Sequence, residues 1–490
     1  MNELQIAEDL HQDGKTDKAI EIYRKHLKSN PNSAITHCGL AKLFTKQGYW
    51  NQAIDSYQQG VELDPSQFSN CYVLGKYLKA LGYQDKAVSL YCKIGKVLEN
   101  KDKINSAIEW YQSAIELNLK PQWFHLYIGD LQRRKNNLKA AIFSYLQAIN
   151  IAPEFWRPHD RLLIIVQRQK VDTTLLKKMV DVYRQVIERK PNYLLAYSNL
   201  GNILTKLGKL DEAIDFYQRA SYRQNLQLKP DFIANAWDAR KKGHEPKFLI
   251  IGSMRCGTTS LYEYLTQHPQ FLPAIKKEIK FFNFNFSSGK SWYQAHFPAI
   301  ADNQKYFTAE ASPDYLYYPY IAKKIADLFP NIKLVVMLRN PVDRSISQYY
   351  HWLKVGAEYR PLEEVISSEL ELIKQMAQPS FDGNLKQKRK VGCLLESVYI
   401  YFLEKWLRIF PREQLLILKS EDFYTNPPKT LSQVCNFVGL PDYQLTEYKT
   451  YNAGSYKKID ESTRQTLVDC FHPHNQRLQE FLGMNFSWDN

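Results

Sequence analysis

The 490-residue chain has few cysteines and no long apolar run. Its seven cysteines show no paired spacing, which excludes a disulfide framework and a cysteine-rich zinc site. No stretch of 18 uncharged apolar residues occurs, so a membrane-spanning helix is not expected. The first residues, Met1 to Leu4, are polar and lack an apolar signal-peptide core. We therefore expect a cytoplasmic protein with reduced thiols.

The composition predicts more than one domain and places most of the positive charge in the first half. Hydrophobic residues make up 44% of the chain, which excludes a wholly disordered protein, and 490 residues suit two or more domains. The net charge is +14; residues 1–246 hold 36 Lys+Arg and 26 Asp+Glu, whereas residues 247–490 hold 29 and 25. We expect the first half to offer a basic surface to an acidic protein partner or a polyanionic acceptor, without specific nucleic-acid binding.

Small and aromatic residues recur every 34 positions in the first half. The first series is Gly14, Ala19, Tyr23 and Pro31, then Gly48, Ala53, Tyr57 and Pro65, then Gly82, Ala87 and Tyr91. A second series starts only 20 positions later and contains Ala107, Tyr111 and Ala114, then Ala141, Tyr145 and Ala148. Tyr183 returns as Tyr217. We interpret these tyrosines as core residues and not as a platform for stacking bases.

The interval and the order of residues resemble the tetratricopeptide repeat. In such helix pairs small residues allow close approach, a glycine ends the first helix and tyrosine fills the seam. We expect about six repeats in an α superhelical array over residues 1–225, with a poor match at 155–178. A capping helix and linker are expected over residues 226–246, which are polar and end on Pro246. The resemblance implies a partner protein on a concave surface.

The second half, residues 247–490, changes to short apolar runs between helical patterns. Strand-like runs occupy 247–252, 333–338 and 414–419, and helical patterns include 258–267 and 394–409. Strands that alternate with helices predict an α/β domain of the P-loop type, with a parallel sheet flanked by helices.

A glycine-rich loop follows the first of these strands and reads Gly252-Ser-Met-Arg-Cys-Gly-Thr-Thr-Ser260. A strand, such a loop and a helix form an anion site, because loop amides and the helix N-terminus point at the ligand. A nucleoside triphosphatase needs lysine where this chain has Thr258, and an acidic magnesium ligand where it has Arg339-Asn340. The loop therefore predicts an anionic nucleotide without a metal, and a nucleoside-triphosphate kinase is the weaker hypothesis.

Residues 247–490 resemble the sulfotransferase family that uses 3'-phosphoadenosine 5'-phosphosulfate (PAPS), in particular its carbohydrate enzymes of heparan-sulfate type. The glycine-rich loop resembles the family's 5'-phosphosulfate loop. The family's 3'-phosphate motif resembles Arg339-Asn-Pro-Val-Asp-Arg344-Ser-Ile-Ser347-Gln-Tyr349. Its catalytic segment resembles Lys277-Glu278-Ile-Lys280-Phe-Phe282, and the loop that closes over the nucleotide resembles Tyr451-Asn-Ala-Gly-Ser-Tyr-Lys-Lys458.

The resemblance implies a PAPS-dependent sulfotransferase that releases 3',5'-adenosine bisphosphate (PAP) and uses no metal. Glu278 is the expected general base, and Arg255 is expected to stabilise charge on the leaving oxygen. The residues expected to bind the donor are Arg255, Cys256, Gly257, Thr258, Thr259, Ser260, Arg339, Ser347, Tyr456, Lys457 and Lys458. Those expected to contact the acceptor are Lys280, Ser312, Asp314 and Tyr315.

The sequence does not decide the identity of the acceptor. A hydroxyl or amine of a saccharide is the first choice, and a peptide tyrosine is the second. Carbohydrate members often show Lys-Ser-Pro-x-Tyr, where this chain has Ala311-Ser-Pro-Asp-Tyr315 after Glu310. Either Glu310 and Asp314 favour an acceptor less anionic than heparan sulfate, or they cap the next helix. An inactive sulfotransferase-like scaffold is a further alternative, against which the intact Arg255, Glu278, Arg339 and Ser347 argue.

Overall fold

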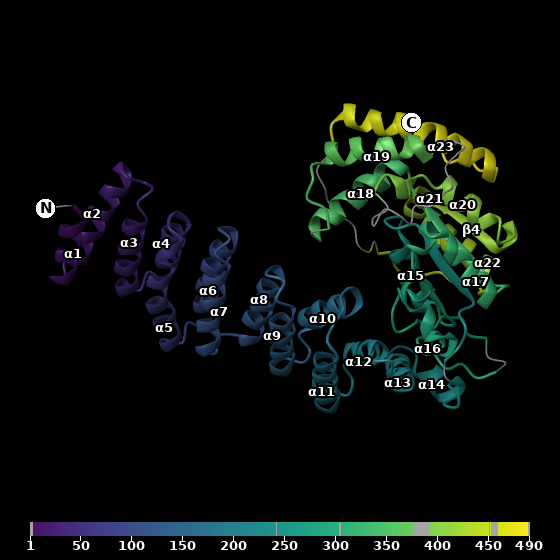
Figure 1. Cartoon of the computed structure of the whole chain (residues 1–490), viewed down its shortest axis with the longest axis horizontal. Helices are drawn as coiled ribbons and strands as arrows, with labels where there is room; N and C mark the ends of the chain where they lie inside the picture. Colours follow the sequence, from purple (N-terminus) through teal and green to yellow (C-terminus); the bar gives the residue numbers. More distant parts are fainter. Residues whose placement is uncertain are drawn as a thin grey trace. The chain divides into compact units, whose positions relative to one another are not determined.

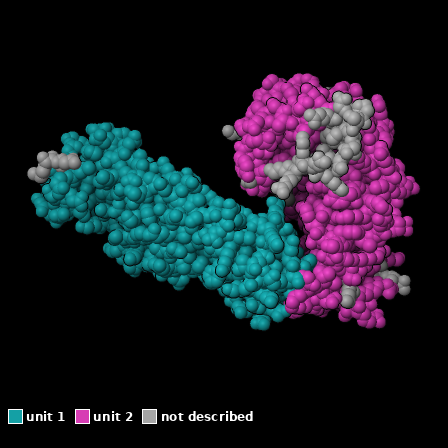
Figure 2. All heavy atoms as spheres, in the orientation of Figure 1, with its two compact units in different colours: residues 1–207 teal, residues 208–490 magenta. Residues whose placement is uncertain are grey.

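Helices are the regular secondary structure of the described part of the first 207 residues, where no strand occurs (Figure 1). The computed structural model describes residues 3–241, 243–302, 305–355, 357–376, 392–449, 451 and 459–488. The α-helices are α1 (Glu3–Gln12), α2 (Thr16–Ser29), α3 (Ala34–Gln47), α4 (Trp50–Leu63), α5 (Tyr72–Ala80), α6 (Gln84–Asn100), α7 (Ile104–Glu116), α8 (Pro121–Arg134), α9 (Leu138–Ile151), α10 (Trp156–Arg168), α11 (Thr173–Arg189) and α12 (Leu194–Lys206). Together with the 3-10 helix Pro65–Cys71 they form one compact unit, residues 1–207 (Figure 2).

A residue in the left-handed conformation marks the turn inside several repeats. It is Gly14, Gly48 and Gly82 in the first series, with φ of 77°, 78° and 79°. Twenty positions later the same place belongs to Asp102, and 34 positions after that to Asn136, with φ of 56° and 57°. Aspartate and asparagine tolerate this conformation better than other non-glycine residues. The glycine turns are confirmed. Asp102 and Asn136 take the place of glycine in the second series, which explains why the glycine pattern is not visible there in the sequence.

The irregular 20-residue step arises because one helix serves in two repeats. Tyr91 of α6 packs on Gly75 of α5, whereas Gly95, also on α6, packs on Tyr111 of α7. A Cβ added at Gly75 would lie 2.8 Å from the Tyr91 ring, and one at Gly95 would lie 2.2 Å from the Tyr111 ring. Helix α6 is therefore the second helix of one repeat and the first helix of the next.

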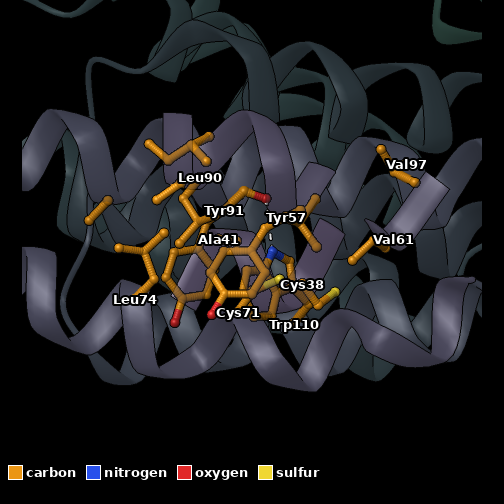
Figure 3. Close-up of a cluster of buried hydrophobic side chains, with 14 of the residues drawn as sticks. Cys38, Ala41, Tyr57, Val61, Cys71, Leu74, Leu90, Tyr91, Val97 and Trp110 are labelled. Carbon is orange, nitrogen blue, oxygen red and sulfur yellow. Dashed lines mark hydrogen bonds between the residues drawn. The ribbon is translucent and has the colours of Figure 1, made fainter. Parts of the chain in front are cut away.

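The tyrosines that recur in the repeat pattern are buried, which confirms their interpretation as core residues. Tyr91 stacks on Trp110 with ring centroids 4.3 Å apart, and the indole Nε1 donates to the Tyr91 carbonyl at 3.0 Å (Figure 3). In the poorly matching stretch, a fully buried His159 binds the Tyr183 hydroxyl through Nδ1 at 3.1 Å. A polar contact thus replaces the glycine–tyrosine packing at this point.

The second compact unit, residues 208–490, begins with a helix that still carries the tyrosine of the repeat pattern. Its α-helices are α13 (Leu210–Leu228), α14 (Pro230–Ala236), α15 (Thr258–Gln267), α16 (Lys290–Gln294), α17 (Pro319–Leu328), α18 (Pro341–Lys354), α19 (Leu362–Met376), α20 (Ile400–Leu407), α21 (Ser420–Thr425), α22 (Pro427–Val438) and α23 (Glu461–Leu482). Its strands are β1 (Phe248–Gly252), β2 (Ala309–Ala311), β3 (Lys333–Leu338) and β4 (Leu415–Lys419).

The four described strands form one parallel sheet in the order β2-β1-β3-β4. All five residues of β1 are buried, as expected for a strand covered on both faces. Phe248, Ile250, Val335 and Met337 share a core with α15 and α22. The sheet thus has the parallel order and flanking helices that the sequence predicted.

Two elements differ from the prediction. Strand β2 was not foreseen, because three residues with a central glutamate make no apolar run. The helix expected over 394–409 is divided into a 3-10 turn, Leu395–Ser397, and α20. The Glu369 carboxylate accepts hydrogen bonds from the amides of residues 393, 394 and 395. This tertiary contact holds the start of the segment outside the helix.

Among the described helices, none combines the length and the hydropathy needed to cross a membrane.

The double role of α6 predicts that Gly95→Ala destabilises the chain. Alanine favours a helix over glycine by about 1 kcal/mol, but its methyl group would strike a ring that a 2.7 Å hydrogen bond from Tyr111 to Glu99 holds in place. We expect the free energy of unfolding to fall by about 1–3 kcal/mol, measured by urea unfolding of the full chain. Ser89→Ala, exposed on the same helix, should change it by less than about 0.5 kcal/mol; equal stability of both variants would contradict the packing argument.

Candidate active site

The carboxyl ends of β1, β2 and β3 meet at one edge of the sheet, with β1 in the middle. The connections from β1 and β2 therefore run in opposite directions, and such a switch point is where open parallel sheets bind ligands. The glycine-rich loop follows β1, Asp314 follows β2 and Arg339 follows β3. The topology thus gathers three of the predicted site segments.

The protein itself binds three successive carbonyl groups of the glycine-rich loop. Arg344 Nε donates to the Met254 carbonyl at 3.1 Å, and Arg339 donates to that of Arg255 at 3.4 Å. Ser420 Oγ donates to the Cys256 carbonyl at 2.8 Å. In a planar trans peptide the N–H points opposite to the C=O, so the following amides are directed away from these partners. The Gly257 amide joins the first-turn amides of α15, which have no acceptor within the helix, whereas the Cys256 amide donates to the Ser253 carbonyl at 3.3 Å.

The backbone of the loop takes two left-handed steps, at Arg255 (φ 67°) and Gly257 (φ 85°). A non-glycine residue in this conformation costs on the order of 1–3 kcal/mol and persists only where its surroundings impose it. At Gly257 a Cβ would also lie 3.1 Å from the Tyr424 hydroxyl and 3.3 Å from the Phe423 ring. The loop is therefore tightly specified.

Arg255 connects the two halves of the predicted donor site. Its Nε donates to the hydroxyl of Ser347 on α18 at 3.1 Å, and Ser347 is only 3% exposed. Since the Arg339 side chain binds the Arg255 carbonyl, the structure brings Arg255, Arg339 and Ser347 together.

The remaining residues of the glycine-rich loop differ in whether their side chains are accessible. Cys256 is fully buried, and burial raises the pKa of its thiol, so it presents only its backbone. Thr258 is nearly buried and Thr259 is partly exposed. The hydroxyl of Ser260 accepts a hydrogen bond from the amide of Tyr451 at 3.1 Å. This contact places the start of the predicted closing loop beside α15. Its residues Tyr456, Lys457 and Lys458 lie outside the described residues.

A buried polar cluster that the sequence did not reveal binds Ser253 and Met254 of the glycine-rich loop. The Tyr317 hydroxyl accepts from the Met254 amide at 3.1 Å and also bonds Ser253 Oγ. Arg344 is fully buried, donates to Tyr317 at 3.0 Å and forms an ion pair with Glu396. Burial raises the pKa of the Glu396 carboxyl, and the guanidinium opposes that rise. Arg344 stood in the predicted motif without a role, and no spacing marked Tyr317 or Glu396.

Glu278 lies between two lysines. Its carboxylate oxygens are 3.1 Å from Lys277 Nζ and 3.2 Å from Lys280 Nζ, and its side chain is 38% exposed. Burial raises the pKa of Glu278, but the two lysines lower it by more, so its pKa lies below the ordinary 4.5. The carboxylate is thus ionised at neutral pH and able to accept a proton.

The residues predicted to contact the acceptor fall into two groups. Lys280 Nζ lies 3.6 Å from the Asp314 carboxylate, which also accepts from Asn283 at 3.0 Å; burial raises the pKa of Asp314 and Lys280 lowers it. Ser312 and Tyr315 are fully buried instead and donate to Glu310 at 2.6 and 3.0 Å. Here they hold the Glu310 carboxylate, and their contact with an acceptor stays a prediction.

Glu310 itself is fully buried and accepts two further hydrogen bonds, from the Tyr293 hydroxyl at 2.8 Å and the Ile279 amide at 3.0 Å. It therefore caps no helix; through the Ile279 amide it holds the segment that carries Glu278. Across the described part of the chain, no group of three or more His, Cys, Asp or Glu side chains is arranged to hold a metal ion.

Comparison with known families matches both halves of the chain. The sulfotransferase domain matches residues 245–474. Tetratricopeptide repeats match residues 39–67, 88–121, 126–155 and 195–232. The matches at 88–121 and 195–232 include α6–α7 and α13, so α6 starts a repeat and α13 has repeat sequence although it lies in the second unit.

Individual relatives match about half of the chain. The membrane-associated sulfotransferase kil1 of Dictyostelium discoideum is 27% identical, and the match covers 50% of this chain and 67% of that protein. The human bifunctional heparan sulfate N-deacetylase/N-sulfotransferase 3 is 30% identical over 48% of this chain, which spans only 30% of that relative.

Solved structures align with each half. A sulfotransferase from Alicyclobacillus acidocaldarius is 27% identical with a TM-score of 0.41, covering 50% of this chain and all of the other. The tetratricopeptide-repeat protein YrrB is 16% identical with a TM-score of 0.24, covering 43% of this chain and 93% of the other. The family matches carry the assignment: residues 245–474 are a sulfotransferase domain, preceded by tetratricopeptide repeats.

Proposed function

We propose that the chain is an enzyme that transfers a sulfuryl group from PAPS to a hydroxyl or amine of an acceptor, most favourably a saccharide. The observation that carries the proposal is the 3.1 Å hydrogen bond between Arg255 and Ser347. It joins the loop expected at the 5'-phosphosulfate to the helix expected at the 3'-phosphate. One anionic nucleotide with charge at both ends fits cations placed in this way.

The residues present fit this donor. The amides of Gly257, Thr258 and Thr259 stand at the N-terminus of α15, where backbone N–H groups and the helix dipole favour an anion. Arg339 supplies a fork of N–H donors suited to a phosphate, and Ser347 supplies a hydroxyl. Arg255 would exchange its bond to Ser347 for the negative oxygens of the donor. Its fixed positive charge then stabilises charge on the leaving oxygen without giving a proton.

The chemical step needs a base and a free path to sulfur. PAPS supplies the sulfuryl group; the acceptor oxygen or nitrogen forms a bond to sulfur as the bond from sulfur to the 5'-phosphate oxygen breaks, leaving PAP. Glu278 takes the acceptor proton. Lys277 and Lys280 keep this carboxylate ionised at neutral pH, although the same low pKa makes it a weaker base. Positioning therefore contributes a large part of the catalysis.

A saccharide is the favoured acceptor because a relative carries the name heparan sulfate N-sulfotransferase. The acceptor differs from heparan sulfate in our proposal, since Ala311 stands in place of a lysine and Asp314 adds negative charge beside Glu278. A less anionic sugar suits these charges. A peptide tyrosine is the second candidate, because the repeat array is able to present a polypeptide.

The repeat array has its own proposed role, which is to bind an acidic protein or a polyanionic acceptor. The 36 Lys+Arg against 26 Asp+Glu of residues 1–246 support this role. A cytoplasmic location remains part of the proposal, although one relative is named as membrane-associated.

The first test is transfer from labelled PAPS to a panel of neutral and sulfated saccharides and tyrosine peptides, read as the mass gain of one sulfuryl group. We expect transfer by the wild type and a loss of about 10²–10⁴-fold in kcat for Glu278→Gln, since the amide cannot accept the proton. PAP should bind both forms equally. Glu413→Gln, an exposed change of the same charge, should keep full activity. If the wild type and Glu278→Gln are equally inert across the panel, the catalytic role of Glu278 is contradicted.

The pH dependence should reveal the lysines around Glu278. The base works deprotonated, and its pKa lies below 4.5, so kcat/KM should stay high from neutral pH down to about 4.5 and fall only below it. Lys280→Met removes one cation, which raises the pKa of Glu278 and moves the acid limb of the profile to higher pH. Lys323→Met, on an exposed helix surface, should leave the limb in place. An unshifted limb in Lys280→Met would argue against Glu278 as the titrating base.

The hydroxyl of Tyr317 should matter for the donor. Tyr317→Phe leaves the half-buried Met254 amide and the buried Ser253 hydroxyl without this partner, and an unpaired buried group costs about 1–3 kcal/mol. We expect PAP affinity, measured by calorimetry on protein shown to be folded by circular dichroism, to fall about tenfold. Tyr359→Phe, at an 83% exposed ring, is the control. Equal affinity in both variants would rule out support of the loop by Tyr317.

A further inference from the structure

The segment that carries Glu278 has no regular secondary structure between residues 273 and 280. Without a ladder or helix, its backbone polar groups must find partners elsewhere, and these partners set its position. The half nearest the sheet is held by the end of β2 and the residues that follow it. Ala311 donates to the Lys277 carbonyl at 2.8 Å, and the Lys280 amide donates to Ser312 at 3.3 Å.

The other half of the segment is held by helix α13. Gln224 Nε2 donates to the Ala274 carbonyl at 3.2 Å and to the Pro273 carbonyl at 3.5 Å. Five residues along the chain, Lys229 Nζ donates to the His268 carbonyl at 3.0 Å. These side chains bind backbone within ten residues of Glu278. Gln224 lies on a helix with tetratricopeptide-repeat sequence, and Lys229 directly follows that helix.

Helix α13 supports the same segment a second time, through α16, which lies beside it (Figure 1), and the turn that follows α16. The fully buried Tyr217 ring lies 4.0 Å from the ring centroid of His296 and 5.5 Å from that of Trp292. The His296 carbonyl in turn accepts the Ile275 amide at 2.9 Å. Burial lowers the pKa of His296 to about 3, so its neutral ring packs as an aromatic. Both routes from α13 end on residues 273–275.

We propose that α13, the last helix with repeat sequence, positions the catalytic base of the sulfotransferase domain. Gln224 and Tyr217 act as positioning residues: they hold residues 273–275, and this sets where Glu278 stands relative to the donor. The contacts stand by themselves, and only their catalytic consequence rests on the proposed function. The working enzyme unit then begins at α13, ahead of the first residue of the sulfotransferase family match at 245.

The test compares Gln224→Glu with Gln227→Glu in the full-length chain. Glutamate keeps the shape of glutamine, but it removes the N–H donors and turns a carboxylate toward two carbonyls. Gln227 is exposed on the same helix, so its variant makes the same charge change without that loss. For Gln224→Glu we expect kcat to fall about tenfold while the KM for PAPS stays within about twofold, because a displaced base affects the reacting geometry and not the donor site. Amide hydrogen exchange over residues 274–280 should speed up about tenfold.

Hydrogen exchange separates this proposal from the proposed function. If the wild type transfers sulfate and Gln224→Glu matches Gln227→Glu in kcat and in exchange, the positioning role is wrong and the enzyme assignment stands. If no acceptor is sulfated by the wild type, the exchange measurement still decides, because unchanged protection of residues 274–280 overturns the role of Gln224. A rise in the KM for PAPS equal to the fall in kcat would also overturn it, since this would indicate general loosening of the domain.

Discussion

The buried guanidinium of Arg344 connects the segments from which the anion site is built. It binds the Met254 carbonyl in the glycine-rich loop, the Cys393 carbonyl and the Glu396 carboxylate before α20, and the Tyr317 hydroxyl after β2. Removing a charge from water is costly unless its hydrogen bonds are all made. The loss of any of these partners would therefore be costly. The bond to Met254 turns its carbonyl inward, and Arg339 and Ser420 hold the next two carbonyls of the loop in the same way.

The rest of the site follows the same rule, in which irregular backbone is held by buried polar side chains. Glu310 accepts four hydrogen bonds, one of them from the Ile279 amide next to Glu278, much as Arg344 donates to several segments around the loop. Such fully satisfied networks allow little reorganisation, and a fixed arrangement of charges is what sulfuryl transfer requires. Glu278 remains partly exposed between its lysines, where an acceptor is able to reach it.

The repeat half uses a different device, the fit of a tyrosine ring against a glycine of the neighbouring helix. Because the fit is local, a single helix such as α6 offers Tyr91 to one neighbour and Gly95 to the other, and the array skips part of a repeat without losing its core. Tyr217 of α13 occupies the same position within the repeat as these tyrosines, but its ring lies against His296. A residue type selected by the repeat pattern is thus also used by the enzyme unit.

The sequence by itself determined the elements that depend on neighbours in the chain. These are the glycine turns of the repeats, the buried strands and the loop and arginine motifs, because periodicity and backbone conformation are local properties. The family matches confirmed the two domain types, whereas the roles of the individual site residues remain predictions. Only the tertiary structure decided what holds the site in place. Ser253 meets Tyr317 from 64 positions away and Gln224 meets Ala274 from 50, and no spacing rule marks such partners, since they meet only when strands and helices pack.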